Sequence, residues 1–376
     1  MANTRNEPGA PAAPGVIPLS VPQLAGNEWK YAKECLDTNW VSSAGPFVDR
    51  FERDIAAYLC VPHAVAVVNG TAALHVALEI AGVKPGDEVV IPSLTFIATA
   101  NAVHYAGAIP AILDVEPDYW QLDPAKLDRF LRQHCEHRGD GGIYDRQTGR
   151  RVSAIVPVHL LGHPCDMDPI LGLAREFGLA VVEDAAEALG TLYKGTPVAT
   201  LGDIGCLSFN GNKTITSGGG GMIVTHSDKL AERARYLTTQ AKDNAEDYVH
   251  NEVGYNYRLI NIAAALGCAQ MEQLAGFLET KRRNAHTYTD RLATVPGITP
   301  MREAPWAASG FWLYTVLVNS DEFGMTNREL QQVLREAKIQ SRLIWQPMHQ
   351  SPAHRAAPRY DVSVAEDIYR LALSLP

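Results

Sequence analysis

The 376-residue sequence lacks an apolar run long enough to span a bilayer, and its first residues lack the basic-then-apolar pattern of a secretory signal. Positively charged residues are also fewer than negatively charged ones, because the sequence has 33 Lys and Arg but 42 Asp and Glu residues, which gives a formal net charge of −9. A negative surplus disfavours unspecific binding to nucleic acids and anionic membranes. We therefore expect a cytoplasmic protein with no nucleic-acid or membrane partner.

Cysteines are few, and none of the six forms a C-x-x-C pair. Scattered free thiols are typical of a reducing cellular compartment. The segment "HLLGHPCDMD" (159–168) contains two histidines, a cysteine and two aspartates, but their spacing matches no standard zinc site. We expect no metal there and interpret the segment as a strand end followed by a loop.

The length of the chain and its 46% of hydrophobic residues predict two domains rather than one core. Residues 1–16, rich in Pro, Ala and Gly, are expected to form a mobile tail. Across 17–258, continuous runs of Val, Ile and Ala separated by helical patterns predict a large α/β domain with a mostly parallel sheet. Residues 259–376 predict a smaller α+β domain, with one long helical segment at 261–292 and no convincing element in the final "LALSLP".

Three polar stretches follow predicted strands, which is where a parallel sheet binds its ligands. In the first, "NGTAAL", Gly70 permits a tight turn, and Thr71 and Ala72 begin a helix. The free amides and partial positive charge of a helix N-terminus suit a phosphate. The same residues also fit a simple turn and helix cap, so this stretch alone leaves both interpretations open.

The second stretch is "VVEDAAEALG", where Glu183 and Asp184 follow an apolar strand. A carboxylate at a buried strand end is costly unless it meets a cation or a hydrogen-bond donor. A protonated heterocyclic nitrogen would be such a partner, and so would an Arg or Lys elsewhere in the chain.

The third stretch is "SFNGNKTITSGGGG" (208–221), in which Ser208 ends a strand and Lys213 follows in a loop. The four glycines from Gly218 to Gly221 allow the backbone to pass close to something bulky and flat. A confined lysine can lose its proton and act as a nucleophile, although a lone lysine is more often a surface residue.

Together the three stretches supply what pyridoxal phosphate requires on an α/β domain. A helix N-terminus holds the phosphate, a buried carboxylate keeps the ring nitrogen protonated, and a lysine forms a Schiff base with the aldehyde. Their combination in this chain order is far more specific than any one of them.

The sequence resembles the DegT/DnrJ/StrS family of sugar aminotransferases, which have the fold type I architecture of aspartate aminotransferase. The resemblance covers residues 17–376 and rests on "NWVSSAGPFVDRFE", "NGTAALHVAL", "PSLTFIATANAV", "EDAAEALG", "SFNGNKTITSGGGGMIVT" and "GYNYRLINIAAALGCAQMEQL". It implies Lys213 as the Schiff-base lysine and Asp184 as the partner of the ring nitrogen. The further residues that it implies around the cofactor are Gly70, Thr71, Ala72 and Ser208 at the phosphate, Phe96 stacked on the ring, and Asn256 reaching the phosphate of the neighbouring subunit.

Within this family, "GNEWKYAKECLDTNWVSSAG" and "TTQAKDNAEDYVHNEVGYNYRL" look most like the LegC-type subgroup. The resemblance implies a homodimer with shared sites that moves an amino group from glutamate to C4 of a UDP-linked 4-keto-6-deoxy-N-acetylhexosamine, for bacterial surface amino sugars. A GDP- or dTDP-linked keto sugar is the first alternative. A sugar dehydratase is a weaker one, because those relatives carry His in place of the lysine, and a non-catalytic relative is the last.

The sequence departs from the family pattern in two places. Glu187 stands where many relatives have Gln or His beside the cofactor, which bears on how the ring's phenolic oxygen is held. The family also continues beyond "SLP" into a last helix, so we expect the sequence to be part of a longer chain.

Overall fold

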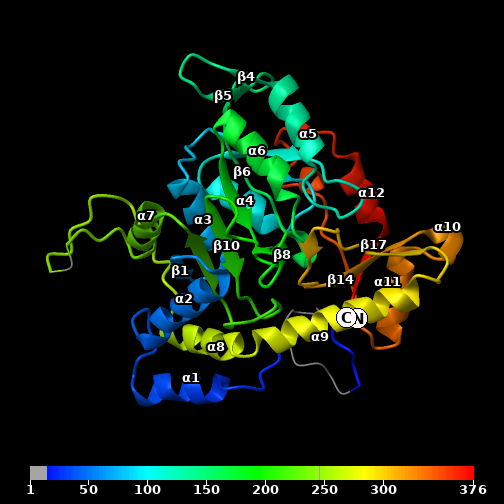
Figure 1. Ribbon diagram of the computed structural model, residues 1–376, viewed down its shortest axis with the longest axis horizontal. Coiled ribbons are helices and arrows are strands. Elements are labelled where there is room, and N and C mark those ends of the chain that lie inside the picture. Colours follow the sequence, from blue (N-terminus) through cyan, green and yellow to red (C-terminus); the bar gives the residue numbers. More distant parts are fainter. Residues whose placement is uncertain (1–14, 245) are drawn as a thin grey trace.

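The computed structural model describes residues 15–244 and 246–376, and its centre is a ten-stranded sheet (Figure 1). The predicted tail lies outside the described residues as far as residue 14. Eight strands follow one another across the sheet in the order β1 (His63–Val67), β11 (Gly221–Thr225), β10 (Ile204–Ser208), β7 (Ala180–Asp184), β6 (Arg151–Ile155), β2 (Glu88–Pro92), β3 (Ile109–Leu113) and β16 (Arg359–Tyr360). A hairpin of β4 (Cys135–His137) and β5 (Ile143–Asp145) extends the sheet beside β6.

The sheet is mostly parallel, as the sequence predicts. β7 pairs in parallel with β10 and β6, and β2 pairs in parallel with β6 and β3. Only β11, between β1 and β10, runs antiparallel to both of its neighbours among these central strands. Every residue of β2 and of β11 is buried, which explains why the apolar runs are continuous rather than alternating.

Helices cover both faces of this sheet, so that two hydrophobic cores form. One face packs on α2 (Pro46–Leu59), α6 (Met167–Phe177) and α8 (Asn261–Met271). The other face packs on α3 (Gly70–Ile80), α4 (Ile97–Tyr105) and α7 (Asp228–Thr238). The remaining elements of this part are α1 (Glu28–Asp37), which packs on α8, and α5 (Pro124–Arg129), which continues into a π-helical turn at Phe130–His134.

The carboxyl-terminal part forms a separate core around a second sheet. Its four strands are β12 (Ile298–Pro300), β14 (Tyr314–Val318), β17 (Ala372–Leu375) and β15 (Arg342–Leu343), in that order. Its helices are α9 (Leu274–Leu292), α10 (Ser320–Phe323), α11 (Asn327–Glu336) and α12 (Ser363–Leu371). A small sheet of β13 (Ala307–Ala308), β8 (Leu192–Tyr193) and β9 (Thr196–Pro197) joins the two parts, and single 3₁₀ turns occur at Leu160–Gly162 and Met348–Gln350.

Two sequence expectations for this region are wrong. Residues 372–375 are a strand in the middle of the second sheet, because β14 and β15 pair with them on either side. The helical segment at 261–292 is two helices, which follow one another along one side of the molecule in Figure 1. At the break, the side-chain amide of Gln273 donates to the carbonyl of Ala269 and to the carboxylate of Glu28.

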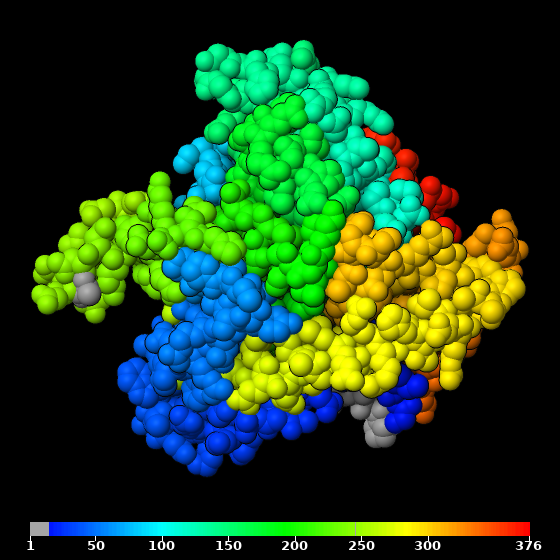
Figure 2. Space-filling model, in the orientation of Figure 1, coloured from blue at the N-terminus to red at the C-terminus, as the bar shows by residue number. Residues whose placement is uncertain are grey.

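Residues 246–254 project from the body of the molecule beside α7 (Figure 2). Tyr248 and Val253 in this arm have exposed fractions of 69% and 82%. None of the helices in the described ranges combines the length and the apolar composition that crossing a membrane requires.

Candidate active site

Lys213 lies in the loop after β10, and its side chain is only 13% exposed. Its Nζ atom lies 3.5 Å from Oε1 of Glu187 and 4.2 Å from the centre of the Trp312 ring. The lysine is therefore confined between a buried carboxylate and an aromatic face, an environment that restrains the amine.

Asp184 ends β7 and is buried beside the amino-terminal turn of α4. Thr99 donates its hydroxyl to Oδ2 at 2.7 Å, and the amide of Ala186 donates to Oδ1 at 3.1 Å. Burial raises the pKa of Asp184, and these two hydrogen bonds oppose the rise. Within the described residues the carboxylate has no ion pair with an Arg or Lys, so the simple alternative of a structural salt bridge does not hold.

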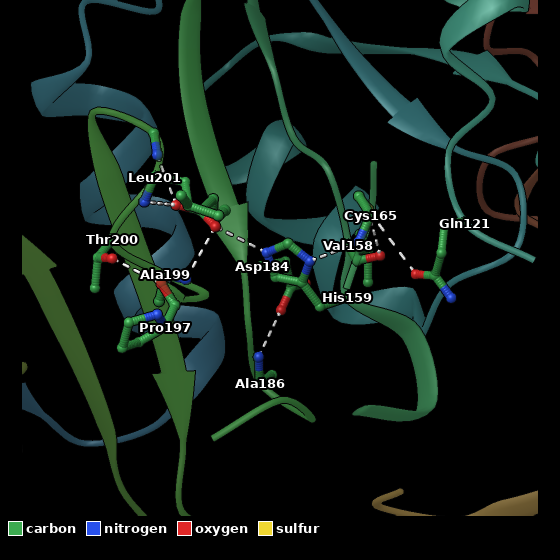
Figure 3. Close-up of polar contacts among 12 residues, drawn as sticks. Gln121, Val158, His159, Cys165, Asp184, Ala186, Pro197, Ala199, Thr200 and Leu201 are labelled. Atoms are coloured by element: carbon green, nitrogen blue, oxygen red, sulfur yellow. Dashed lines mark hydrogen bonds and ion pairs between the residues drawn. The ribbon is translucent and has the colours of Figure 1, made fainter. Parts of the chain in front are cut away.

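The neighbouring carboxylate, Glu183, is engaged in hydrogen bonds within the protein through both of its oxygens. Its oxygens accept three backbone amides from residues 199–202 at 2.7 to 2.9 Å, and His159 Nε2 lies 2.9 Å away. His159 Nδ1 accepts the amide of Cys165, so the ring proton is on Nε2 and points at Glu183. Figure 3 shows His159 between this network and Cys165, with Asp184 facing Ala186 instead. His159 thus has a structural role, and the described residues contain no cluster suited to a metal ion.

The predicted phosphate residues meet at the start of α3. A Cβ atom on Gly70 would lie 2.8 Å from the Cβ of Ser208, so the end of β10 directly abuts this helix N-terminus. Asn69 caps the helix, and its side chain accepts the amide of Ala72 at 2.8 Å. That amide is therefore already satisfied, so we expect a phosphate to be bound by Gly70, Thr71 and Ser208 instead.

Two glycines of the run are required by the fold itself. A Cβ atom on Gly221 would lie 2.5 Å from the backbone carbonyl of Asn69, whereas one on Gly218 would meet nothing nearer than 3.9 Å. The strict need for glycine at 221 therefore comes from close packing of β11 against the strand end that precedes α3. Gly218 serves the turn instead, because its φ is +79°.

Phe96 and Asn256 are both more exposed than the residues above. Phe96 precedes α4, is 49% exposed, and its ring centre lies 6.0 Å from that of Trp345 in an edge-to-face arrangement. Asn256 is exposed and bridges Thr239 through its backbone. Its side chain makes no hydrogen bond within the described ranges, so its action on a neighbouring subunit stays a prediction.

Glu187 is held by an unusual turn. Its Oε2 atom accepts the amide of Leu161 at 2.8 Å, and burial raises its pKa while Lys213 opposes the rise. Leu161 has a φ of +58°, in the left-handed region that a branched side chain seldom adopts. The next residue, Gly162, has a φ of +84°, and a Cβ atom there would lie 2.7 Å from the amide nitrogen of Trp312.

Sequence reasoning missed three residues of this site. Thr99 stands within the quoted "PSLTFIATANAV", and its position in the first turn of α4 was the available signal. Trp312 and Arg342 come from the carboxyl-terminal part, more than 90 residues from Lys213 in the chain, and carry no local signal. Arg342 is half-buried without an ion pair to the described residues, and burial lowers its pKa while nearby Glu187 opposes this.

The fold and this arrangement of lysine and carboxylates define a pyridoxal phosphate-dependent aminotransferase of fold type I. Residues 22–376 match the DegT/DnrJ/EryC1/StrS aminotransferase family, and the chain belongs to it. The family assignment made from the sequence is therefore confirmed.

Among curated relatives, the chain is 42% identical to GDP-perosamine synthase of Caulobacter vibrioides, over 96% of this chain and 92% of that one. It is 37% identical to GDP-perosamine synthase of Escherichia coli O157:H7, over 96% of this chain and 93% of that one. Among solved structures, it is similar to DesV of S. venezuelae in complex with a ketimine intermediate, with a TM-score of 0.83 and 33% identity over 93% and 88% of the chains. It is also similar to DesI, solved in the presence of its TDP-sugar product, with a TM-score of 0.86 and 29% identity over 97% of this chain and 88% of that one.

The residues present fit the cofactor of this family. Asp184 is buried, has only neutral direct hydrogen-bond donors and has a raised pKa, so a cationic ring nitrogen would stabilise it. The α3 N-terminus and Ser208 offer donors for a phosphate at the carboxyl ends of the parallel strands. Lys213 offers an amine that is nearly enclosed.

Proposed function

We propose that the protein transfers an amino group from glutamate to the 4-keto carbon of a GDP-linked 6-deoxy sugar. The support for GDP is the name of the two relatives at 42% and 37% identity, both GDP-perosamine synthases. The UDP-linked substrate and the LegC-type subgroup, which the sequence favoured, have no support among these relatives. A dTDP-linked sugar is the second candidate, because DesI is structurally similar and was solved with a TDP-sugar product.

The observation that carries the catalytic part of the proposal is that Lys213, in the loop after β10, meets two buried carboxylates, Glu187 and Asp184, from the segment at the end of β7. When bound, pyridoxal phosphate supplies an aldehyde and an electron-withdrawing ring. Asp184, oriented by Thr99 and Ala186, would keep the ring nitrogen protonated. Lys213 would hold the cofactor by condensing with its aldehyde, with loss of water, and as a free amine it would accept and return the proton that aminotransfer requires.

The presence of Lys213 also weighs against the two non-aminotransferase alternatives. A sugar dehydratase of this kind would carry His at that position, and a non-catalytic relative would have no need to keep the lysine beside two buried carboxylates. Borohydride reduction tests this directly, because an active lysine would become irreversibly joined to the cofactor and a visible absorption band would vanish.

The substrate is tested by supplying glutamate with GDP-, UDP- and dTDP-linked 4-keto-6-deoxy sugars at equal concentrations. We expect the GDP-linked sugar to give the highest kcat/KM for formation of the amino sugar. A clear preference for the UDP- or dTDP-linked sugar would overturn the nucleotide assignment while leaving the aminotransferase assignment intact.

The second part of the proposal is a homodimer with shared sites. Trp40, Val41 and Ile260 have exposed fractions of 52%, 40% and 44%, and they lie together because Asn261 bonds the carbonyls of Trp40 and Ser42. Exposed apolar patches of this kind favour self-association. In the shared site, Asn256 of one subunit would contact the phosphate bound by the other.

Mixing two inactive variants tests the shared site. Lys213→Ala and Asn256→Asp chains are each expected to be nearly inactive as homodimers. In a heterodimer one site carries both lesions and the other carries none, so activity should return toward half of wild type. If the chains exchange and activity stays at the level of the parents, Asn256 does not act across an interface.

A further inference from the structure

The amine of Lys213 has two neighbours of different kinds. Glu187 Oε1 lies 3.5 Å from Nζ, and the centre of the Trp312 ring lies 4.2 Å from it. Trp312 is only 2% exposed, so the ring face toward the lysine is shielded from water. A shielded indole face attracts a cation more strongly than an exposed one does.

Trp312 is attached to the loop that carries the lysine. Its indole Nε1 donates to the carbonyl of Asn212, the residue before Lys213, at 2.7 Å. Ser20 donates its hydroxyl to the same carbonyl at 3.1 Å. The indole plane is therefore fixed relative to the backbone of Lys213 although the two residues come from different parts of the fold.

Trp312 and Glu187 are joined through one strained turn. The amide of Trp312 donates to the carbonyl of Leu161 at 3.0 Å, while the amide of Leu161 donates to Glu187 at 2.8 Å. Since Leu161 adopts a φ of +58°, its conformation is maintained by these contacts rather than by local preference. Glu187, Leu161, Trp312, Asn212 and Lys213 thus form a closed ring of contacts.

We propose that Trp312 is a positioning residue for Lys213, a role that rests on the proposed function. Its ring, together with the Glu187 carboxylate, holds the protonated amine of Lys213 whenever the lysine is not bonded to the cofactor. An aminotransferase releases and rebinds its lysine in each cycle, so the freed amine must stay near the reacting carbon. The ring and the carboxylate keep it there and limit its contact with water.

Trp312 also connects this position to the expected ring-stacking residue. Its ring is parallel to that of Trp345, with an interplanar angle of 1° and centres 6.0 Å apart, and Trp345 meets Phe96 edge to face. Phe96, Trp345 and Trp312 thus form a continuous aromatic series that ends beside the amine of Lys213.

The test uses the cofactor-free protein and needs no catalysis. Acetic anhydride acetylates only neutral amines, so stabilising the charged form of Lys213 slows its labelling. Tryptophans with one to four ring fluorines, introduced at position 312, weaken the attraction for a cation at nearly unchanged shape. The labelling of Lys213 relative to that of Lys194, an exposed lysine 51% accessible, is measured by mass spectrometry at one pH.

We expect the Lys213 to Lys194 labelling ratio to rise stepwise with fluorine number, by about two- to thirtyfold over the series. Glu187→Gln should raise it too, because a glutamine oxygen can still accept the Leu161 amide but carries no charge. The matched control is the same fluorinated series at Trp120, a buried tryptophan that is 4% exposed. It should leave the ratio unchanged.

Two results would overturn the proposal: a ratio that does not change across the Trp312 series, or an equal rise in the Trp120 series. Either is distinguishable from failure of the proposed function, which borohydride trapping examines separately. If the cofactor is trapped on Lys213 but the Lys213 to Lys194 labelling ratio does not change with fluorination of Trp312, the lysine is catalytic and Trp312 does not hold it.

Discussion

Replacing Asp184 by Asn is expected to have opposite effects on the stability of the cofactor-free protein and on its affinity for the cofactor. Burial raises the pKa of Asp184, so the folded chain binds this proton more tightly than the unfolded chain does. Stability of the cofactor-free protein therefore falls as the pH rises from the unfolded value, about 3.9, through the folded pKa. Asn removes this loss. Cofactor-free Asp184→Asn should unfold at a higher temperature than wild type at pH 8, with the gain shrinking toward pH 4.

With the cofactor present, we expect Asp184→Asn to lower the stability of the protein relative to wild type instead of raising it. The bond between the carboxylate and a protonated ring nitrogen is charge-assisted and contributes about 1.5–3 kcal/mol. Asp184→Asn should therefore weaken cofactor binding about ten- to 150-fold, at 1.4 kcal/mol for each factor of ten. The stabilisation produced by saturating cofactor shrinks by the same amount. The assay is the unfolding temperature with and without pyridoxal phosphate, measured from pH 5 to pH 8.

The neighbouring Glu183 provides the control. Glu183→Gln disturbs a carboxylate that accepts three backbone amides, so it should lower the unfolding temperature whether or not the cofactor is present. An Asp184→Asn protein that loses stability without cofactor, or that responds to cofactor as wild type does, would refute the assigned role of this side chain.

Three further outcomes are expected. Lys213→Ala should abolish turnover. Mass spectrometry after borohydride reduction of the wild-type protein should find the cofactor on Lys213, and finding it on Lys194 would contradict the assignment. Thr99→Val should lower kcat by roughly tenfold, because Asp184 loses a hydrogen bond of about 1.5 kcal/mol; unchanged kinetics would argue against its orienting role. Burial raises the pKa of Glu88 to about 7, so stability falls as the pH rises from about 4.3 through 7. Glu88→Gln should therefore raise the unfolding temperature much more at pH 8 than at pH 4, and an equal change at both pH values would contradict this.

The strands of the large sheet, and the order of the reactive residues that follow them, could be predicted from the amino-acid sequence. Strands such as β2 are buried on both faces, so they must be apolar almost throughout, and that composition is visible without any tertiary knowledge. Asp184 and Lys213 follow such strands directly, so their place at the carboxyl edge of the sheet follows from chain order alone.

Which polar groups remain free for chemistry depends on contacts between segments that are distant in the sequence. Glu183 and Asp184 are adjacent in sequence, but opposite side-chain directions along a strand send one into a turn at 199–202 and the other toward Thr99. In the same way, β17 has only four residues and gains its hydrogen bonds from β14 and β15, which lie elsewhere in the chain.

The surroundings of Lys213 depend even more strongly on distant residues. Trp312 reaches the lysine from about 100 residues away, and its place depends on contacts with the Leu161 turn and the Asn212 carbonyl. A local pattern reflects interactions between neighbours in sequence, whereas these contacts exist only after both sheets have packed together. For that reason the sequence could indicate the reacting groups, and the folded chain alone determined what holds the lysine.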